Sequence, residues 1–312
     1  MTKAGEQGWG SLGEPDIEQQ AAKLLHVVET PVATLRHAFY RLGATVPNYR
    51  FGSDTLVYGV GGPCVQHHDG ARLVRRRLMF YPRGYEHRLE FLGPTHILAI
   101  ELTSFRDSGG NGFSGPADAT PLPANLYTPV WRVMLKAADG EPPAIVGMAI
   151  AELLGRIAAF ANSSAPASVI DTIDRIHAQW SEVASARALA TSAGVSPQYL
   201  CRAFRKATGT TIQQYALLLR LDHARGLLWA TGLPIADIAA RTGFADQSHL
   251  TRAMTADTAR TPLRLRRSAP CSEFAREMAH LFSSQELPKR DPAAPLYPDR
   301  FRAAGGLPAP RY

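Results

Sequence analysis

The sequence has few cysteines and no long apolar run. Its 312 residues include Cys64, Cys201 and Cys271, whose irregular spacing excludes a disulfide framework and provides no CxxC pair for zinc. No stretch of 18 apolar residues occurs, so no membrane-spanning helix is predicted. The first 20 residues lack an apolar segment behind a basic end, so no secretion signal is expected. These absences predict a cytoplasmic protein.

Two common enzyme motifs are also missing. The chain has neither a GxSxG nucleophile elbow nor a phosphate-binding P-loop, and we expect no catalytic residues and no cofactor. Hydrophobic residues make up 45% of the chain, enough for a sizeable core, and its length suits two domains. The net charge of +7 fits a polyanionic partner. We therefore expect a two-domain protein that is not an enzyme.

Turn signals and composition divide the chain into regions. Short apolar runs separated by Gly, Pro and Asp-Gly predict many β-strands from about 24 to 103, typical of a barrel or sandwich. Apolar periodicity then predicts helices over 126–138 and 143–161. The predicted fold class is α+β. The predicted regions are a loose leader (1–22), a cupin-like domain (23–162), a linker (163–168), a helical domain (169–268), and a short helix near 271–283 within a disordered tail (269–312).

Two segments of the helical region, 189–211 and 238–262, resemble one another. The corresponding positions are Leu189 and Ile238, Gly194 and Gly243, and Leu200 and Leu250. Each copy has a short helix, a glycine suited to positive φ, an apolar residue, and a helix-capping Ser196 or Asp246. Residues 211–231 predict one long helix between the copies. Each copy is therefore predicted to be a helix-turn-helix unit.

The second helix of each unit has one apolar side and one polar side. Arginine pairs bidentately with guanine, and glutamine with adenine. We expect base contacts from Gln198, Cys201, Arg202, Gln247, Ser248, Thr251 and Arg252. We expect phosphate contacts from Arg205, Lys206, Thr211, His249, Thr261 and Arg264. Residues 171–270 hold 13 Lys and Arg against 7 Asp and Glu, so most of the positive surplus lies here, and double-stranded DNA is the predicted partner.

With these motifs, residues 170–267 resemble the C-terminal domain of the AraC/XylS family of bacterial transcriptional regulators. The most specific stretch runs from Ile238 to Pro262. The resemblance implies a sequence-specific regulator that presents two recognition helices from one domain, with RNA polymerase as a further candidate partner. Three departures are Ala259 where the family usually has glycine, Leu265 where it has tyrosine, and Thr255-Ala256 in place of a basic pair. They predict weaker phosphate contacts from the second unit.

The β-rich region resembles a cupin, and its two motifs bear on metal binding. Gly43 to Gly62 has the spacing of the first motif, but its ligand positions hold Tyr49, Phe51 and Thr55. Pro82, Gly84 and His87 match the second motif. Since one of four ligand positions is kept, we predict no metal. We expect a small-molecule effector among Tyr49, Phe51, Tyr58, Tyr81 and His87. The alternative is that His87 is a hydrogen-bonded histidine of the barrel.

Three further features each have two interpretations. Cys64 is either inert or a redox sensor. The helices within 126–161 either form a homodimer contact, which the family resemblance favours, or pack on their own barrel. A basic cluster is either solvated, or binds an acidic effector or a second stretch of DNA. Its members are Arg72, Arg75, Arg76, Arg77, Arg83 and Arg88.

Two other functions compete with an effector-responsive regulator. A metal-dependent cupin enzyme with a DNA-binding tail is disfavoured by the missing ligand positions. A constitutive architectural DNA-binding protein would show no change in stability or DNA affinity with any metabolite. The sequence favours the regulator but identifies neither the effector nor the DNA site.

Overall fold

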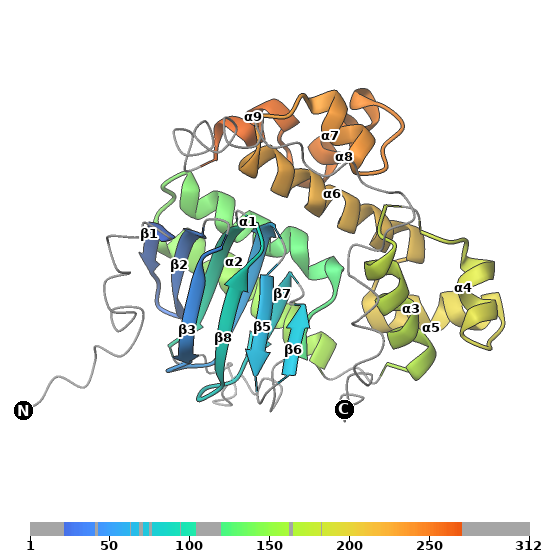
Figure 1. The fold of residues 1–312 in the computed structure, drawn as a ribbon, viewed down its shortest axis with the longest axis horizontal. Helices are drawn as coiled ribbons and strands as arrows, with labels where there is room; N and C mark the ends of the chain where they lie inside the picture. The colour runs from blue at the N-terminus through green and yellow to red at the C-terminus, as the bar shows by residue number, and fades with distance from the viewer. Residues whose placement is uncertain are drawn as a thin grey trace, which may run out of the picture.

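The structure, a computed structural model, places strands in the first part of the chain and helices in the second (Figure 1). It describes residues 22–269 except for 41–42, 63, 69–70, 75–76, 94, 104–119, 162–164 and 182. The predicted helix near 271–283 and the predicted tail after 269 lie outside the described residues, as does the leader up to residue 21. The predicted α+β class is confirmed.

The strands form two antiparallel sheets. The six-stranded sheet has the order β1-β2-β9-β4-β7-β10, and the four-stranded sheet has the order β3-β8-β5-β6. The strands are β1 (Ala22–Glu29), β2 (Ala33–Tyr40), β3 (Thr45–Arg50), β4 (Thr55–Gly61), β5 (Cys64–His68), β6 (Ala71–Val74), β7 (Leu78–Tyr81), β8 (Glu86–Phe91), β9 (Thr95–Leu102) and β10 (Thr120–Pro121). The predicted β-rich region is therefore confirmed.

The two sheets enclose an apolar core between them. Val46 and Leu89 of the smaller sheet meet Val57 and Ile97 of the larger one in this core. Among the described residues no ladder joins the two sheets, so of the predicted barrel or sandwich the structure has an open, two-layered arrangement rather than a closed barrel. Alternating hydrophobicity specifies which face of a strand is buried. Barrel closure depends instead on which edge strands hydrogen-bond to each other.

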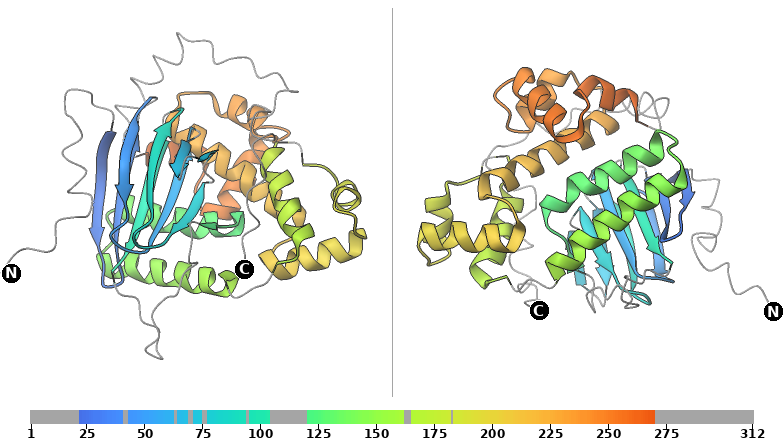
Figure 2. Two further views of the ribbon diagram at one scale, coloured as in Figure 1. Left: turned by 60° about the horizontal axis from the view of Figure 1, so that its bottom comes forward. Right: turned by 180° about the vertical axis from the view of Figure 1, so that it is seen from behind.

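Helices cover the outer face of the six-stranded sheet. A short 3₁₀ helix, η3 (Ala124–Leu126), leads into α1 (Tyr127–Ala138) and α2 (Pro143–Ala161), which lie over that face (Figure 2). These bounds confirm the helices predicted over 126–138 and 143–161. Most of α1 is buried within the chain, and α2 turns its apolar side inward. Ile145 and Met148, 37% and 71% exposed, remain on the outer side of α2.

The second part of the chain is helical. Its helices are α3 (Ala167–Ala178), α4 (Ala186–Ser192), α5 (Pro197–Thr208), α6 (Ile212–Ala230), α7 (Ile235–Arg241), α8 (Gln247–Thr258) and α9 (Pro262–Arg267). Helix α6 runs between the group α3–α5 and the group α7–α9 (Figure 1). One apolar cluster extends from Leu56 of the sheet through Trp131 of α1 to Leu228 of α6. The helical part is thus docked on the sheet through a shared core.

A helix needs about 20 mostly apolar residues to span a bilayer. Within the described ranges, no helix combines the length and the apolar character needed to cross a membrane.

Candidate nucleic-acid interface

Helices α4 and α5, and helices α7 and α8, form the two predicted helix-turn-helix units. Gly194 and Gly243 lie at the turns with φ of +68° and +75°, as the sequence predicts for both positions. A Cβ on Gly243 would lie 2.7 Å from the Ser181 carbonyl oxygen, so larger residues do not fit there. The Ser196 hydroxyl accepts a hydrogen bond from the Tyr199 N–H, and the Asp246 carboxylate accepts one from the His249 N–H. Both predicted helix caps are confirmed.

The second helix of each unit has a buried and an exposed side. Leu200 and Phe204 of α5, and Leu250 and Met254 of α8, are fully buried. The opposite side carries the candidate base contacts. Gln198, Cys201, Arg202, Gln247, Ser248 and Arg252 are exposed, and Thr251 is half-buried. The Thr251 hydroxyl donates to the Gln247 carbonyl at 2.8 Å. The geometry leaves these side chains accessible, and their contact with bases stays a prediction.

The candidate phosphate contacts lie at the edges of the same units. Arg205, Lys206, His249 and Arg264 are exposed. Thr211 and Thr261 cap α6 and α9, where their hydroxyls accept hydrogen bonds from the backbone N–H groups of Gln214 and Arg264. Any anion at these two helix ends would therefore meet backbone N–H groups more readily than the threonine hydroxyls.

The two recognition helices end in the same backbone conformation with different residues. Gly209 follows α5 with φ of +72°, and Ala259 follows α8 with φ of +57°. Ala259 is the one non-glycine residue with positive φ among those described. An alanine in this region costs on the order of 1 kcal/mol relative to glycine. The departure from the family pattern at Ala259 therefore changes the strain at the end of α8 rather than its geometry.

Helix α6 is the predicted joining helix, and its bounds confirm that prediction. At its start Thr211 and Gln214 form a reciprocal capping box. The rings of Tyr215 and Phe204 are in edge-to-face contact, which ties α6 to the first unit. The Trp229 indole N–H donates to the Leu265 carbonyl of α9 at 3.0 Å. Helix α6 thus holds the two units in one arrangement.

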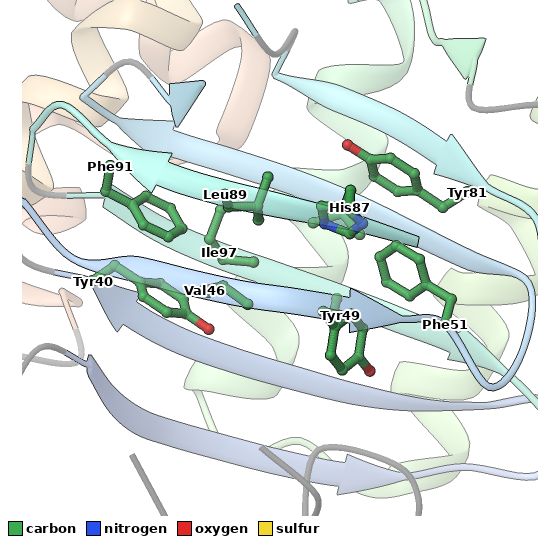
Figure 3. Close-up of a pocket in the computed structure, with 11 residues that line it drawn as sticks. Tyr40, Val46, Tyr49, Phe51, Tyr81, His87, Leu89, Phe91 and Ile97 are labelled. Atoms are coloured by element: carbon green, nitrogen blue, oxygen red, sulfur yellow. The ribbon is translucent and has the colours of Figure 1, made fainter. Parts of the chain in front are cut away.

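A pocket lies between the two sheets, where the effector site was predicted (Figure 3). Tyr49, Phe51, Tyr81 and His87 all contribute to its lining, together with apolar residues such as Ala99. The rings of Phe51, Tyr81 and His87 are stacked, with centroids 4.8 and 5.1 Å apart. The remaining cavity is small, about 30 Å³. The structure therefore brings four of the five candidates together, and their effector role stays a prediction.

Tyr58 does not line this pocket, which corrects its predicted place. Successive side chains of a strand point to opposite faces, and Val57 of β4 occupies the pocket side. Tyr58 points to the helices, where its hydroxyl donates to the Asp222 carboxylate of α6. The register of strand β4 decides the face on which Tyr58 lies, and the sequence did not determine that register.

Several polar groups near the pocket are paired with one another. The Tyr81 hydroxyl donates to Gln66 at 2.6 Å, and the Gln66 amide donates to the Tyr85 hydroxyl at 2.8 Å. Arg36 and Glu101 form an ion pair at 3.1 Å. Burial, and then the Glu101 charge, raise the pKa of Tyr49 to about 12, so its hydroxyl stays protonated. In the part of the chain described, no three His, Cys, Asp or Glu side chains are placed to hold a metal ion.

The arginines of the predicted basic cluster have different surroundings. Arg83 and Arg88 are exposed, and the side chains of Arg72, Arg75 and Arg76 lie outside the described residues. Arg77 instead contacts α6, with its Nε 2.7 Å from the Asp222 carboxylate. The cluster is therefore not one surface, since Arg77 is a structural contact. Cys64 is buried, and its redox role is untested.

Sequence reasoning missed the charged residues that join the two parts of the chain. Asp222 is fully buried and accepts hydrogen bonds from Tyr58 and Trp131. Arg225, also fully buried, contacts Asp257 of α8 and lies over the Trp131 ring. The available signal was three charged residues, Arg220, Asp222 and Arg225, close together on a mostly apolar joining helix. Such residues are rarely buried unless paired.

Comparison with known proteins supports the assignment of the helical part. Residues 189–268 match the model of a family described as a helix-turn-helix domain. The transcriptional regulator GlxA of Rhizobium meliloti is 42% identical over 80 residues, which are 26% of this chain and 25% of that protein. The match thus covers about a quarter of that relative's length.

Two solved structures are similar to separate parts of the chain. A transcriptional regulator of Chromobacterium violaceum, described as containing an AraC-type DNA-binding domain, is 29% identical, with a TM-score of 0.32. The similarity covers 33% of this chain and 91% of that one. A cupin superfamily protein of Desulfitobacterium hafniense is 16% identical, with a TM-score of 0.25, over 27% of this chain and 78% of that one.

The family match and the two capped units fall in one region of the chain. The motif from Ile238 to Pro262, the glycine turns and the match over residues 189–268 all fall within helices α4 to α9. The chain accordingly carries a helix-turn-helix domain over residues 189–268.

Proposed function

We propose that this protein is a sequence-specific DNA-binding transcriptional regulator. The observation that carries the proposal is the pair of capped helix-turn-helix units, whose recognition helices leave Arg202 and Arg252 exposed on each side of one joining helix. Two such helices held by α6 suit two successive major-groove faces of one duplex. The relative named above is a transcriptional regulator, which supports the same function.

The direct test is selection of bound sequences from random duplexes by the full chain at fixed salt. We expect enrichment of a two-part site whose parts lie about one helical turn apart. Binding without sequence preference that fades with salt would contradict specific regulation, because phosphate contacts alone behave in that way.

Single arginine substitutions are expected to assign each unit to one part of the site. Arg202→Ala should remove preference at one part and Arg252→Ala at the other, each at a cost of about 1–3 kcal/mol in binding free energy. Arg205→Ala is the control, since a lost phosphate contact should weaken all duplexes alike and reduce the salt dependence. Affinities for duplexes with one part scrambled measure this. If all three variants lost binding free energy equally on every duplex, the proposed base contacts of Arg202 and Arg252 would be contradicted.

We further propose that the pocket binds a small, uncharged, apolar or aromatic effector. The support is the aromatic lining and the pairing of nearby polar groups with one another. The present cavity of about 30 Å³ is smaller than the roughly 150 Å³ that accommodates benzene. Binding must therefore displace a ring, and Tyr49 is the half-buried candidate.

Filling the pocket is expected to remove the response to an effector. A panel of small aromatic compounds is screened by melting temperature, where a ligand at 100 times its Kd adds about 2.7 kcal/mol of stability. Ala99→Leu places a larger side chain in the lining and should abolish the shift, while Ala236→Leu on the exposed side of α7 should keep it. If the compound raised the melting temperature of Ala99→Leu as much as that of the wild type, it would bind outside this pocket.

We also propose homodimerisation through α2, with Ile145 and Met148 at the contact. Both side chains are apolar and exposed on the outer side of the helix. Light scattering on the full chain should give a dimer mass. A monomer mass across the accessible concentration range would contradict this proposal.

A further inference from the structure

Three histidines gather beneath the end of α6. His26, His37 and His96 come from the adjacent strands β1, β2 and β9 and lie on the sheet face that the helices cover. The His37 Nε2 and His96 Nδ1 atoms are 3.2 Å apart, so one ring donates a hydrogen bond to the other. The His26 and His37 rings are stacked, with centroids 5.9 Å apart. A hydrogen bond between two imidazoles requires at least one of them to be neutral.

Trp229 of α6 closes this cluster. Its ring stacks on His37 at 5.9 Å between centroids and meets His96 edge to face at 5.3 Å. His37, His96 and Trp229 are each 1% exposed. Both histidines are therefore kept from water partly by a side chain of the helical domain. If α6 lifted from the sheet, water could reach both rings. We call this contact of α6 with the outer face of the six-stranded sheet the α6–sheet joint.

The charged groups of the α6–sheet joint do not favour a cation on these rings. Asp222 lies two turns before Trp229 and is paired with Arg77. Arg225 is a buried cation one turn before Trp229 and is paired with Asp257. Two other histidines of the described residues lie on α6 or contact it, and both have partners. His223 accepts from Arg77 and stacks on Trp180, and His177 contacts the Tyr215 hydroxyl.

We propose that the His37–His96 pair makes the α6–sheet joint acid-sensitive, so that proton uptake by these rings favours a chain in which α6 has lifted from the sheet. Protonation of both rings would break their hydrogen bond and place two like charges together at a site that is shielded from water. Water reaches the rings once α6 is released. The inference concerns the joint itself and goes beyond DNA binding.

The direction of the effect follows from the pKa of each histidine. Burial, then the charges of His96 and His26, hold the pKa of His37 well below 6.5, and burial lowers the pKa of His96 to about 3. A depressed pKa in the closed state means that closure is fully favoured above pH 6.5 and weakens as the pH falls from 6.5 toward 3. At pH 5.5, His96 alone shifts the equilibrium about ten-fold toward opening if its ring regains a normal pKa in the open chain.

The test is small-angle scattering by the full chain from pH 7.5 to 5.0 at constant ionic strength, with circular dichroism to follow helix content. The wild type should expand on acidification while its helix content is kept. The double variant His37→Gln/His96→Gln should stay compact, since glutamine keeps hydrogen-bonding groups without a titrating charge. The matched controls His67→Gln on β5 and His223→Gln at the other end of the joint should expand at the wild-type pH.

Three results would overturn the inference. They are no expansion of the wild type by pH 5.0, expansion of the double variant at the wild-type pH, and loss of the response in His223→Gln. If the double variant does not fold, His96→Gln alone should reduce the proton uptake on opening by about one, and an unchanged uptake would overturn the inference equally. A chain that opens in this way yet binds no duplex would contradict the proposed function and leave this inference intact.

Discussion

Replacing Asp222 by alanine is expected to lower the free energy of unfolding by about 3–5 kcal/mol, the range for removing one partner of a buried ion pair. The carboxylate is fully buried and is shared by Tyr58, Trp131 and Arg77. Its loss leaves the Tyr58 hydroxyl and the Trp131 indole N–H without their acceptor and removes the charge opposite Arg77. Urea unfolding of the full chain measures the change.

Two controls separate this effect from a general sensitivity to substitution. Asp222→Asn keeps an oxygen for Tyr58 and Trp131 and loses the charge opposite Arg77, so a smaller loss of about 1–3 kcal/mol is expected. Asp171→Ala removes an exposed pair with Arg175 on α3 and should cost less than about 0.5 kcal/mol. If the alanine variant were as stable as the wild type, the carboxylate would not be holding the α6–sheet joint together.

Replacing Arg225 by methionine is expected to cost about 3 kcal/mol, at the lower end of the range for breaking a buried pair. The guanidinium is fully buried, contacts Asp257 and lies 5.4 Å from the centre of the Trp131 ring. Methionine fills much of the same volume but leaves the Asp257 carboxylate with the Thr128 hydroxyl as its hydrogen-bond donor. The partial exposure of Asp257, 14%, keeps the expected cost below the maximum. Thermal or urea unfolding of the full chain measures it.

The double variant Arg225→Met/Asp257→Asn tests whether charge pairing is the cause. Removing both charges together should recover about 1–2 kcal/mol relative to the sum of the two single changes, because neither charge is then buried alone. Strict additivity of the two changes would mean that packing against Trp131, and not pairing with Asp257, determines the role of Arg225.

The helix-turn-helix units were predictable because their signals are local. Gly194 and Gly243 lie at turns with positive φ, and Ser196 and Asp246 cap the helices that follow. Each of these interactions connects residues within about five positions along the chain. The apolar spacing of Leu200 and Phe204 likewise indicates the buried side of a helix without knowledge of what covers it.

The residues that line the pocket between the sheets were predicted in part, and the limit was the register of the strands. Tyr49, Phe51, Tyr81 and His87 line one cavity, whereas Tyr58 faces the helices. A shift of one position in the pairing register of a strand moves its side chains to the opposite face of the sheet. Because both faces of this sheet are buried, an aromatic residue suits either face, and its identity does not show which face it occupies. The sequence did not show that the barrel stays open for a related reason. The alternation of apolar and polar residues along one strand does not specify which edge strands pair with each other.

The sequence by itself determined the two helix-turn-helix units, their caps and the joining helix, because short-range backbone and capping preferences decide these features. Tertiary structure alone decided that α6 docks on the sheet, that Asp222 binds Tyr58 across 164 positions, and that His37 and His96 lie under Trp229. The physical reason is that a buried charge or imidazole is stable only beside a partner of suitable geometry. That partner is supplied by packing between distant segments, which no local pattern specifies.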